Sequence, residues 1–292
     1  MADRRPPIIL VENVPGFLTS HGGQDFMNAL SALNELGYLM DAFILDAAWF
    51  VPQSRQRLFV IGMSVDMFES TRATEAVFFS RVRPAALTKF IQTRKNIHWH
   101  IRGLPDPPKK GGRLEDIIED APDDSLAWWS HERAEYLLNQ MSPRHRWIAD
   151  QMIAGRSWSY GTVFRRIRHH TSTAELRTDG LAGCLRTPRG GSGRQILFKA
   201  GRGKYCVRLL TPNECARLMG ADGFHITAPL NQALFGFGDA VCVPVKMDRR
   251  ESSAAALGGS FPCVFGGQQC LAPSHSHDSQ YARRRSKSPE DV

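Results

Sequence analysis

The chain has 292 residues, 42% of them hydrophobic and 23% charged, which is ordinary globular composition with enough apolar residues for a core. Its net charge of +8 and pI of about 9.4 favour a polyanionic partner such as nucleic acid, although a plain surplus of surface Lys and Arg is the alternative. Only four apolar residues stand between the N-terminal leader and Glu12. This excludes a signal peptide or membrane span there, so we expect a cytoplasmic protein with no membrane partner.

The first 62 residues alternate between strand and helix patterns. An apolar run at 8–11 predicts a strand buried on both faces of a parallel sheet. Helical spacing follows at 24–36, with Gly37 as its end, and further strands are predicted at 38–45 and 57–62. This order predicts a mostly parallel α/β sheet with right-handed crossovers. Glu12 and Asn13 follow the first strand, where such sheets carry reactive groups.

Residues 64–180 differ in composition and predict a separate, irregular domain. Helices are expected at 128–138 and 143–153, and residues 165–170 form a run of Arg and His after an aromatic residue. That run is either a nucleic-acid-facing surface or a solvated basic face. Regular structure is expected again from 181 to 245, with a helix that begins after Thr211, the predicted N-cap. Residues 247–292 are rich in Ser, Gly, His and Arg and are expected to be disordered.

The six cysteines form no Cys-x-x-Cys pair and no regular disulfide framework, so we expect reduced thiols. Cys263 and Cys270 lie near two histidines in the tail, but the spacing fits no common zinc site, and no metal site is predicted. The other four cysteines have core-like neighbours and are predicted to be structural. They are Cys184, Cys206, Cys215 and Cys242.

Three polar side chains precede the third strand at alternate positions. In an extended segment Gln53, Arg55 and Arg57 share one face. Two guanidinium groups together suit a phosphate or a carbonyl oxygen with negative character. Taken alone, the pattern also fits an edge strand guarded by charges.

Four motifs in a fixed order resemble the DNA cytosine-C5 methyltransferases. The first two are Glu12-Asn13-Val14 and the Pro52-Gln53-x-Arg55-x-Arg57 segment about forty residues later. The third, over 185–195, resembles the family's stretch at the edge of its target-recognition domain, and residues 208–220 are similar to the family's next segment. The fourth, over 237–245, resembles the family's last motif, with Asp239 in place of the usual Asn.

The resemblance implies a fold, a reaction and a set of site residues. The fold is a partial doubly wound, Rossmann-like methyltransferase sheet with a smaller irregular target-recognition domain. The reaction is methyl transfer from S-adenosylmethionine to C5 of a cytosine flipped from double-stranded DNA, after a cysteine thiolate attacks C6. By the resemblance, Glu12 protonates N3 of the base; its alternative is a cap of the next helix. The resemblance also implies that Asn13 orders the loop around the nucleophile and that Gln53 has a supporting role. One of Arg55 and Arg57 contacts the base, and the other holds the catalytic loop or a phosphate. The implied DNA contacts are Arg186, Thr187, Arg189, Gly190, Gly191 and Arg194, and the implied cofactor contacts are Asp239, Ala240 and Val241.

Two motifs that the resemblance requires do not precede Glu12: a glycine-rich cofactor loop and a Pro-Cys-Gln nucleophile loop. Pro262-Cys263 is the only Pro-Cys pair and the one candidate for a displaced nucleophile. Its surroundings predict disorder, whereas a nucleophile must be held rigidly, so we do not assign it this role. We therefore predict no nucleophile in this chain. The predicted divisions are catalytic sheet at 1–63, recognition domain at 64–205, return segment at 206–246 and basic tail at 247–292.

Three functional hypotheses remain open from the sequence. The chain is a truncated form or split subunit of a methyltransferase that needs an N-terminal partner, within a restriction-modification system that includes a cognate endonuclease. Alternatively it is a non-catalytic DNA-binding remnant of such an enzyme. The third hypothesis, an unrelated basic α/β protein, is disfavoured by the motif series.

Overall fold

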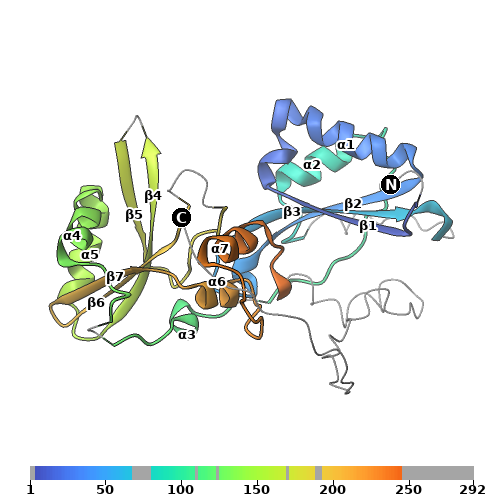
Figure 1. Ribbon diagram of the computed structural model, residues 1–292. Coiled ribbons are helices and arrows are strands. Elements are labelled where there is room, and N and C mark those ends of the chain that lie inside the picture. Colours follow the sequence, from blue (N-terminus) through green and yellow to red (C-terminus); the bar gives the residue numbers. More distant parts are fainter. Residues whose placement is uncertain are drawn as a thin grey trace, which may run out of the picture.

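The computed structural model describes residues 4–67, 80–108, 111–122, 125–168, 171–187 and 193–244. The predicted tail, including Cys263 and Cys270, lies outside these ranges, as does Val245 of the last motif. Two lobes stand at opposite ends of the molecule, and a group of helices lies between them (Figure 1). Within the described ranges, no helix combines the length and apolar character needed to cross a membrane.

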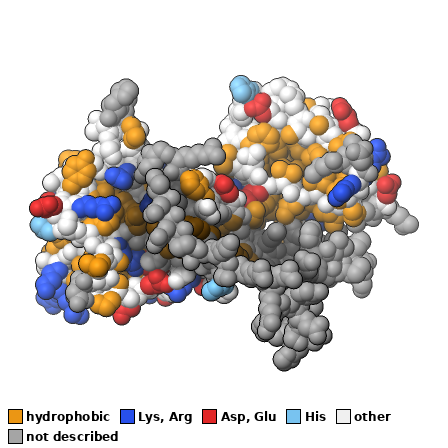
Figure 2. All heavy atoms as spheres, viewed as in Figure 1, with side chains coloured by type: hydrophobic (Ala, Val, Ile, Leu, Met, Phe, Trp, Pro, Cys, Tyr) orange, Lys and Arg blue, Asp and Glu red, His pale blue; other side chains and the backbone are white. Residues whose placement is uncertain are grey.

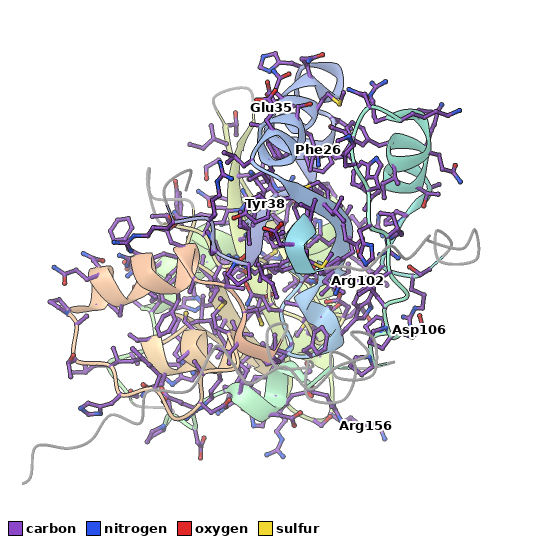
Figure 3. All side chains as sticks on the ribbon, turned by 90° about the vertical axis from the view of Figure 1, so that its right-hand side faces the viewer. Phe26, Glu35, Tyr38, Arg102, Asp106 and Arg156 are labelled. Carbon is purple, nitrogen blue, oxygen red and sulfur yellow. The ribbon has the colours of Figure 1, made fainter. Side chains whose placement is uncertain are left out.

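The N-terminal lobe is a three-stranded sheet covered on one face by helices. Its elements are β1 (Ile8–Asn13), the short 3-10 helices η1 (Pro15–Leu18) and η2 (Ser20–Gly23), α1 (Gln24–Glu35), β2 (Tyr38–Asp46), η3 (Ala47–Trp49), β3 (Gln56–Ser64), η4 (Val65–Met67) and α2 (Ala85–Thr93). The predicted helix and the three predicted strands are confirmed to within two residues. Phe26 of α1 and Tyr38 of β2 are buried in this lobe (Figure 3).

The sheet has the order β1-β3-β2, and both neighbouring pairs are antiparallel. The prediction of a mostly parallel sheet is therefore wrong for the described strands. The strand–helix–strand order does leave β1 and β2 running in the same direction, but β3 lies between them. The connection over 47–55 is shorter than the roughly dozen residues that a parallel crossover needs, so β3 returns antiparallel beside β2.

The prediction that the first strand is buried on both faces is also wrong. In the described sheet β1 is an edge strand, and Ile8 is 41% exposed. Side chains alternate between the two faces of a strand, so Ile9 packs beneath α1 and α2 while Leu10 lies on the opposite face with Phe59. Glu12 pairs in register with Phe59 and shares this second face, away from the helices.

The second lobe is an antiparallel sheet packed against two helices. Its elements are α4 (His131–Asn139), α5 (Pro143–Ala154), β4 (Ser159–Arg168), β5 (Thr171–Arg177), β6 (Ile196–Gly201) and β7 (Lys204–Leu209), with sheet order β5-β4-β6-β7. The two predicted helices are confirmed with small shifts. The expected irregular domain is wrong over this range, because Val163, Leu176 and Phe198 bury an ordered core beneath the helices.

Three helices join the lobes: α3 (Leu114–Ile117), α6 (Pro212–Leu218) and α7 (Leu230–Asp239). Thr211 caps α6 as predicted, and its hydroxyl accepts a hydrogen bond from the Glu214 amide while the Glu214 carboxylate accepts one from the Thr211 amide. The junction core contains Phe237 of α7 together with Val51 from the N-terminal lobe. The last motif is thereby brought beside the segment that leads into the second motif.

Candidate functional site

Glu12 lies at the carboxyl end of β1 and forms an ion pair with Arg57. Arg57 Nε lies 3.0 Å from Glu12 Oε1, and Arg55 Nη2 lies 3.8 Å from the same oxygen. The carboxylate is 14% exposed. The helix-cap alternative is wrong, because η1 has Val14 at its N-cap and no side chain caps it. Asn13 instead accepts a hydrogen bond from the Val14 amide at 2.8 Å.

Arg55 is a buried connector between three segments. Its side chain is only 4% exposed. The guanidinium donates to the carbonyl oxygen of Leu185 at 3.0 Å and to that of Ala240 at 2.8 Å, with longer bonds of 3.4 Å to the carbonyl of Gly238. The alternative of an edge strand protected by charged side chains is wrong, because β3 is the central strand of its sheet and the Arg55 side chain is buried.

Gln53 is a second buried connector beside Arg55. Its side chain is fully buried, with Nε2 donating to the carbonyl of Leu218 at 2.8 Å and Oε1 accepting from the amide of Leu185 at 2.9 Å. The amide therefore links the N-terminal lobe to α6 and to the third motif. This geometry agrees with the supporting role expected for Gln53, which remains a prediction.

Cys184, which the sequence placed among the structural cysteines, is a neighbour of the arginine pair. Its sulfur lies 3.5 Å from Arg57 Nη2 and 3.6 Å from Arg55 Nη1, and its thiol donates to the Leu185 carbonyl. The thiol thus contacts both guanidinium groups, which also approach Glu12. A separation of more than 120 residues along the chain gave no local signal for this contact.

The third and fourth motifs meet beside this cluster. Thr187 Oγ1 donates to Asp239 Oδ1 at 2.5 Å. A Cβ atom on Gly238 would overlap the Thr187 amide nitrogen, so only glycine allows the two backbones to approach so closely. Ala240 is held by Arg55, and Val241 packs against the apolar cluster that contains Phe43 and Phe59. The structure therefore brings together residues of all four motifs.

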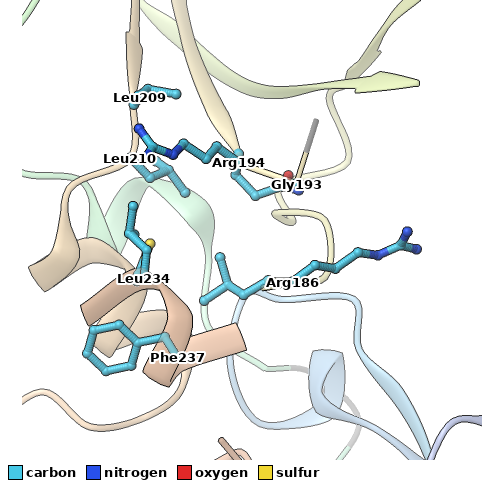
Figure 4. A pocket seen from close by; sticks show the side chains of 10 residues that line it. Arg186, Gly193, Arg194, Leu209, Leu210, Leu234 and Phe237 are labelled. Carbon is cyan, nitrogen blue, oxygen red and sulfur yellow. The ribbon is translucent and has the colours of Figure 1, made fainter. Parts of the chain in front are cut away.

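Two of the predicted DNA-contacting arginines lie at the rim of a small, largely apolar pocket. The pocket is lined by Leu185, Arg186, Gly193, Arg194, Gln195, Leu209, Leu210, Cys215, Leu234 and Phe237. The side chains of Arg186 and Arg194 extend in opposite directions from it (Figure 4). Arg186 is exposed, whereas Arg194 donates to Asn231 Oδ1. The predicted residues Arg189, Gly190 and Gly191 lie outside the described ranges.

Cys215 beneath this pocket is unsuited to nucleophilic attack. Burial, with a smaller contribution from the charge of Glu214, raises the pKa of its thiol to about 12. A thiol with this pKa stays protonated at neutral pH, and the thiolate is the reactive form. Among the described residues, no group of three or more His, Cys, Asp or Glu side chains is arranged to hold a metal ion.

Comparison with known proteins identifies the family. A family model described as C-5 cytosine-specific DNA methylase matches residues 1–252. The chain belongs to this family. Members of the family act on DNA, and this methylase chain carries the family's sequence pattern over most of its length.

Several curated DNA methyltransferases are similar to this methylase chain. The type II methyltransferase M1.ScrFI of Lactococcus lactis subsp. cremoris is 24% identical, with 83% of this chain and 50% of that protein covered. M.MspI of Moraxella sp is 23% identical, with 87% and 47% covered, and M.NlaX of Neisseria lactamica is 26% identical, with 87% and 64% covered. The chain spans about half the length of the first two relatives.

Among solved structures, that of the S. pombe Dnmt2 methyltransferase is similar to this methylase chain. The sequence identity is 16% and the TM-score is 0.46, and 82% of this chain and 62% of that chain are covered. The described fold is mixed α/β with two small antiparallel sheets.

Proposed function

We propose that this chain forms the base-holding and DNA-facing part of a DNA cytosine-5 methyltransferase. The observation that supports this most strongly is the convergence of four motifs around Glu12. Arg57 holds the Glu12 carboxylate, Arg55 holds Leu185 and Ala240, and Thr187 binds Asp239. These contacts join residues that are up to 228 positions apart, from 12 to 240, in one cluster.

In the proposed reaction the chain acts on a cytosine extruded from duplex DNA. Glu12 is the catalytic acid: protonated on the oxygen that does not face Arg57, it donates that proton to N3 while a nucleophile adds to C6 of the ring, and it becomes the carboxylate that Arg57 stabilises. The ion pair with Arg57 uses Oε1, so Oε2 is the atom left to face the base. Asn13 orders the chain that follows the acid through its bond to the Val14 amide.

The attacking cysteine is proposed to come from a segment outside these 292 residues. The sequence contains no Pro-Cys-Gln, and its only Pro-Cys pair lies at 262–263. Cys215 is held as a neutral thiol, and the thiol of Cys184 is engaged by the Leu185 carbonyl. The proposal covers both a longer polypeptide and a separate subunit as the source of that segment.

The cofactor residues proposed from the sequence fit only one edge of a site for S-adenosylmethionine. The methyl group in this family's reaction comes from that cofactor. Asp239 is exposed and uses one carboxylate oxygen for Thr187, so its second oxygen can accept from a hydroxyl or ammonium group. The Ala240 carbonyl is occupied by Arg55, and the Val241 side chain packs inward. The described residues therefore do not form a complete cofactor site, and we derive no step through it.

A complementation assay tests the proposal. The purified chain alone is expected to transfer no labelled methyl group from S-adenosylmethionine to DNA. Co-expression with the reading frame encoded directly upstream should restore transfer if that frame carries a glycine-rich loop and a Pro-Cys-Gln segment. Methyl incorporation by the chain alone would contradict the missing-nucleophile proposal. Failure of every such complement would support the non-catalytic DNA-binding alternative.

DNA binding by the chain should depend steeply on salt, and Arg186 should contribute to it. Replacing the exposed Arg186 by glutamine is expected to weaken binding by a similar factor for all sequences, because a phosphate contact carries no base information. The slope of log K against log salt concentration should fall in magnitude by about one. Fluorescence anisotropy with a mixed-sequence duplex measures this slope. The control is Lys89→Gln, an exposed position on α2, and an equal loss in both variants would argue against a specific role for Arg186.

A further inference from the structure

Asp46 is a carboxylate of the N-terminal lobe that lies outside the four motifs. It is the last residue of β2 and the N-cap of η3, and its Oδ1 accepts a hydrogen bond from the Ala48 amide at 3.1 Å. The same oxygen accepts a hydrogen bond from the amide of Arg55 at 2.8 Å. A helix cap explains the first bond. It does not explain the second, because Arg55 stands nine positions further along the chain.

The second bond ties the connection between β2 and β3 back to the end of β2. The carbonyl oxygen of Arg55 accepts a hydrogen bond from the Ala47 amide at 3.0 Å, so both backbone groups of Arg55 are bound at this point. On the other side, the Ser54 amide donates to the Ala182 carbonyl at 2.9 Å, and the Ala182 amide donates to the Pro52 carbonyl at 2.8 Å. The backbone of the second motif is therefore held between the end of β2 and the segment that leads into the third motif.

The contacts of the Arg55 side chain depend on this backbone position. Its guanidinium donates to the carbonyl oxygens of Leu185 and Ala240 at 3.0 and 2.8 Å. Its Nη2 also lies 3.8 Å from Glu12 Oε1. A shift of the Arg55 backbone changes all three contacts together, because one rigid planar group makes them. The position of the third and fourth motifs relative to Glu12 therefore depends on the bonds that hold the Arg55 backbone.

We infer that Asp46 is a positioning residue for methyl transfer and acts through the backbone of Arg55. The inference rests on the proposed function, because that reaction supplies one of its readouts. Both bonds of Asp46 use Oδ1, and neither requires a negative charge, since a neutral amide oxygen also accepts two hydrogen bonds. Asp46→Asn therefore keeps both acceptor bonds. Asp46→Ala leaves the amides of Ala48 and Arg55 without this acceptor.

Steady-state methyl transfer by the complemented enzyme is the first test. Asp46→Ala is expected to lower kcat by about 10- to 100-fold with little change in KM for DNA, because a small displacement of the groups that hold a site costs up to about 10²-fold. Asp46→Asn should retain the wild-type kcat. Acidic side chains lie at separate points on the surface of the N-terminal lobe (Figure 2). The matched control is Asp66→Ala, which removes an exposed carboxylate beyond the opposite end of β3 and should leave kcat unchanged.

A double-mutant cycle in stability separates positioning of Arg55 from simple capping of η3. The urea midpoint of unfolding is measured for the full chain, for Asp46→Ala, for Arg55→Met and for the double variant. Removal of Asp46 should lower the midpoint less in the Arg55→Met background, because the side-chain bonds that it supports are already lost there. Asp46 is half-buried, so we expect Asp46→Ala to fold. If it does not, Asp46→Ser replaces it in both assays, since the shorter hydroxyl caps η3 but does not also reach Arg55.

The expected pattern is loss of kcat with alanine at position 46, retention of kcat with asparagine, and a less than additive loss of stability in the double variant. Additive shifts of the urea midpoint, a wild-type kcat for Asp46→Ala, or a kcat for Asp46→Asn as low as that for Asp46→Ala would each overturn the inference. An inactive wild-type complement would contradict the proposed function instead. The stability cycle needs no activity, so it would still decide whether Asp46 positions Arg55.

Discussion

Replacing Glu12 by glutamine in the complemented enzyme is expected to lower the methyl-transfer rate by about 10²- to 10⁴-fold. A glutamine amide keeps the size and polarity of the side chain but cannot deliver the proton that N3 requires, and general acid catalysis contributes a factor of this size. Single-turnover incorporation of labelled methyl groups measures the effect. DNA binding should change little, because the Glu12 side chain is only 14% exposed and glutamine has nearly the same size and shape.

Two further variants serve as a control and as an intermediate case for this prediction. Glu35→Gln removes an exposed carboxylate at the end of α1, outside the cluster, and should leave the rate unchanged. Glu12→Asp keeps the acid but withdraws it by one methylene from Arg57 and from the base, so its rate should fall between those of the wild type and Glu12→Gln. A wild-type rate for Glu12→Gln would remove Glu12 from the role of proton donor.

The sequence predicted local elements well because their signals are local. Helical spacing from Gln24 onwards and the capping pair of Thr211 and Glu214 each describe contacts within a few residues. The direction of β3 was not predicted correctly. The alternation of strand and helix patterns carries no information on which strands become neighbours, and the short connection before β3 decided that its neighbours are antiparallel.

Tertiary contacts explain the elements that the sequence missed. Helix α7 contains Gly236 and Gly238, and each interior glycine costs about 1 kcal/mol relative to alanine. The helix forms nonetheless because Ala233 and Phe237 are buried in the junction core. The sequence of β4 showed no clear strand pattern. Beyond residue 163 this strand has only β5 beside it, and arginines stand there in place of alternating apolar residues.

In the candidate site, too, sequence motifs indicated which residues belong to the site, but not which contacts each of them makes. The first two motifs assigned Glu12, Arg55 and Arg57 to the same reaction, and the structure places their side chains together. The sequence could not assign different roles to the two arginines, because both occupy the same face of an extended pattern. Their burial and their hydrogen-bond partners now distinguish them.

Replacing Arg55 by methionine is expected to lower the free energy of unfolding by about 3 kcal/mol or more. The change leaves the carbonyl groups of Leu185, Gly238 and Ala240 without their shared donor, and a buried unsatisfied acceptor costs about 1–3 kcal/mol. Methionine has similar length, so the loss reports hydrogen bonds more than packing. Urea denaturation of the full chain, followed by tryptophan fluorescence, measures the change.

Arg57→Met is the matched control for the role of Arg55. Arg57 is 17% exposed and donates to the carbonyl of Gln56, and its ion-pair partner Glu12 keeps Arg55 within 3.8 Å when Arg57 is removed, so the loss of Arg57 should cost only about 1 kcal/mol. Arg55→Lys should be nearly as destabilising as Arg55→Met, because one ammonium group cannot reach carbonyls on both sides of the site. Equal stability of the Arg55 and Arg57 variants would contradict this division. The expected result makes Arg55 a positioning residue that holds the third and fourth motifs, and it leaves Arg57 as the arginine available to the base.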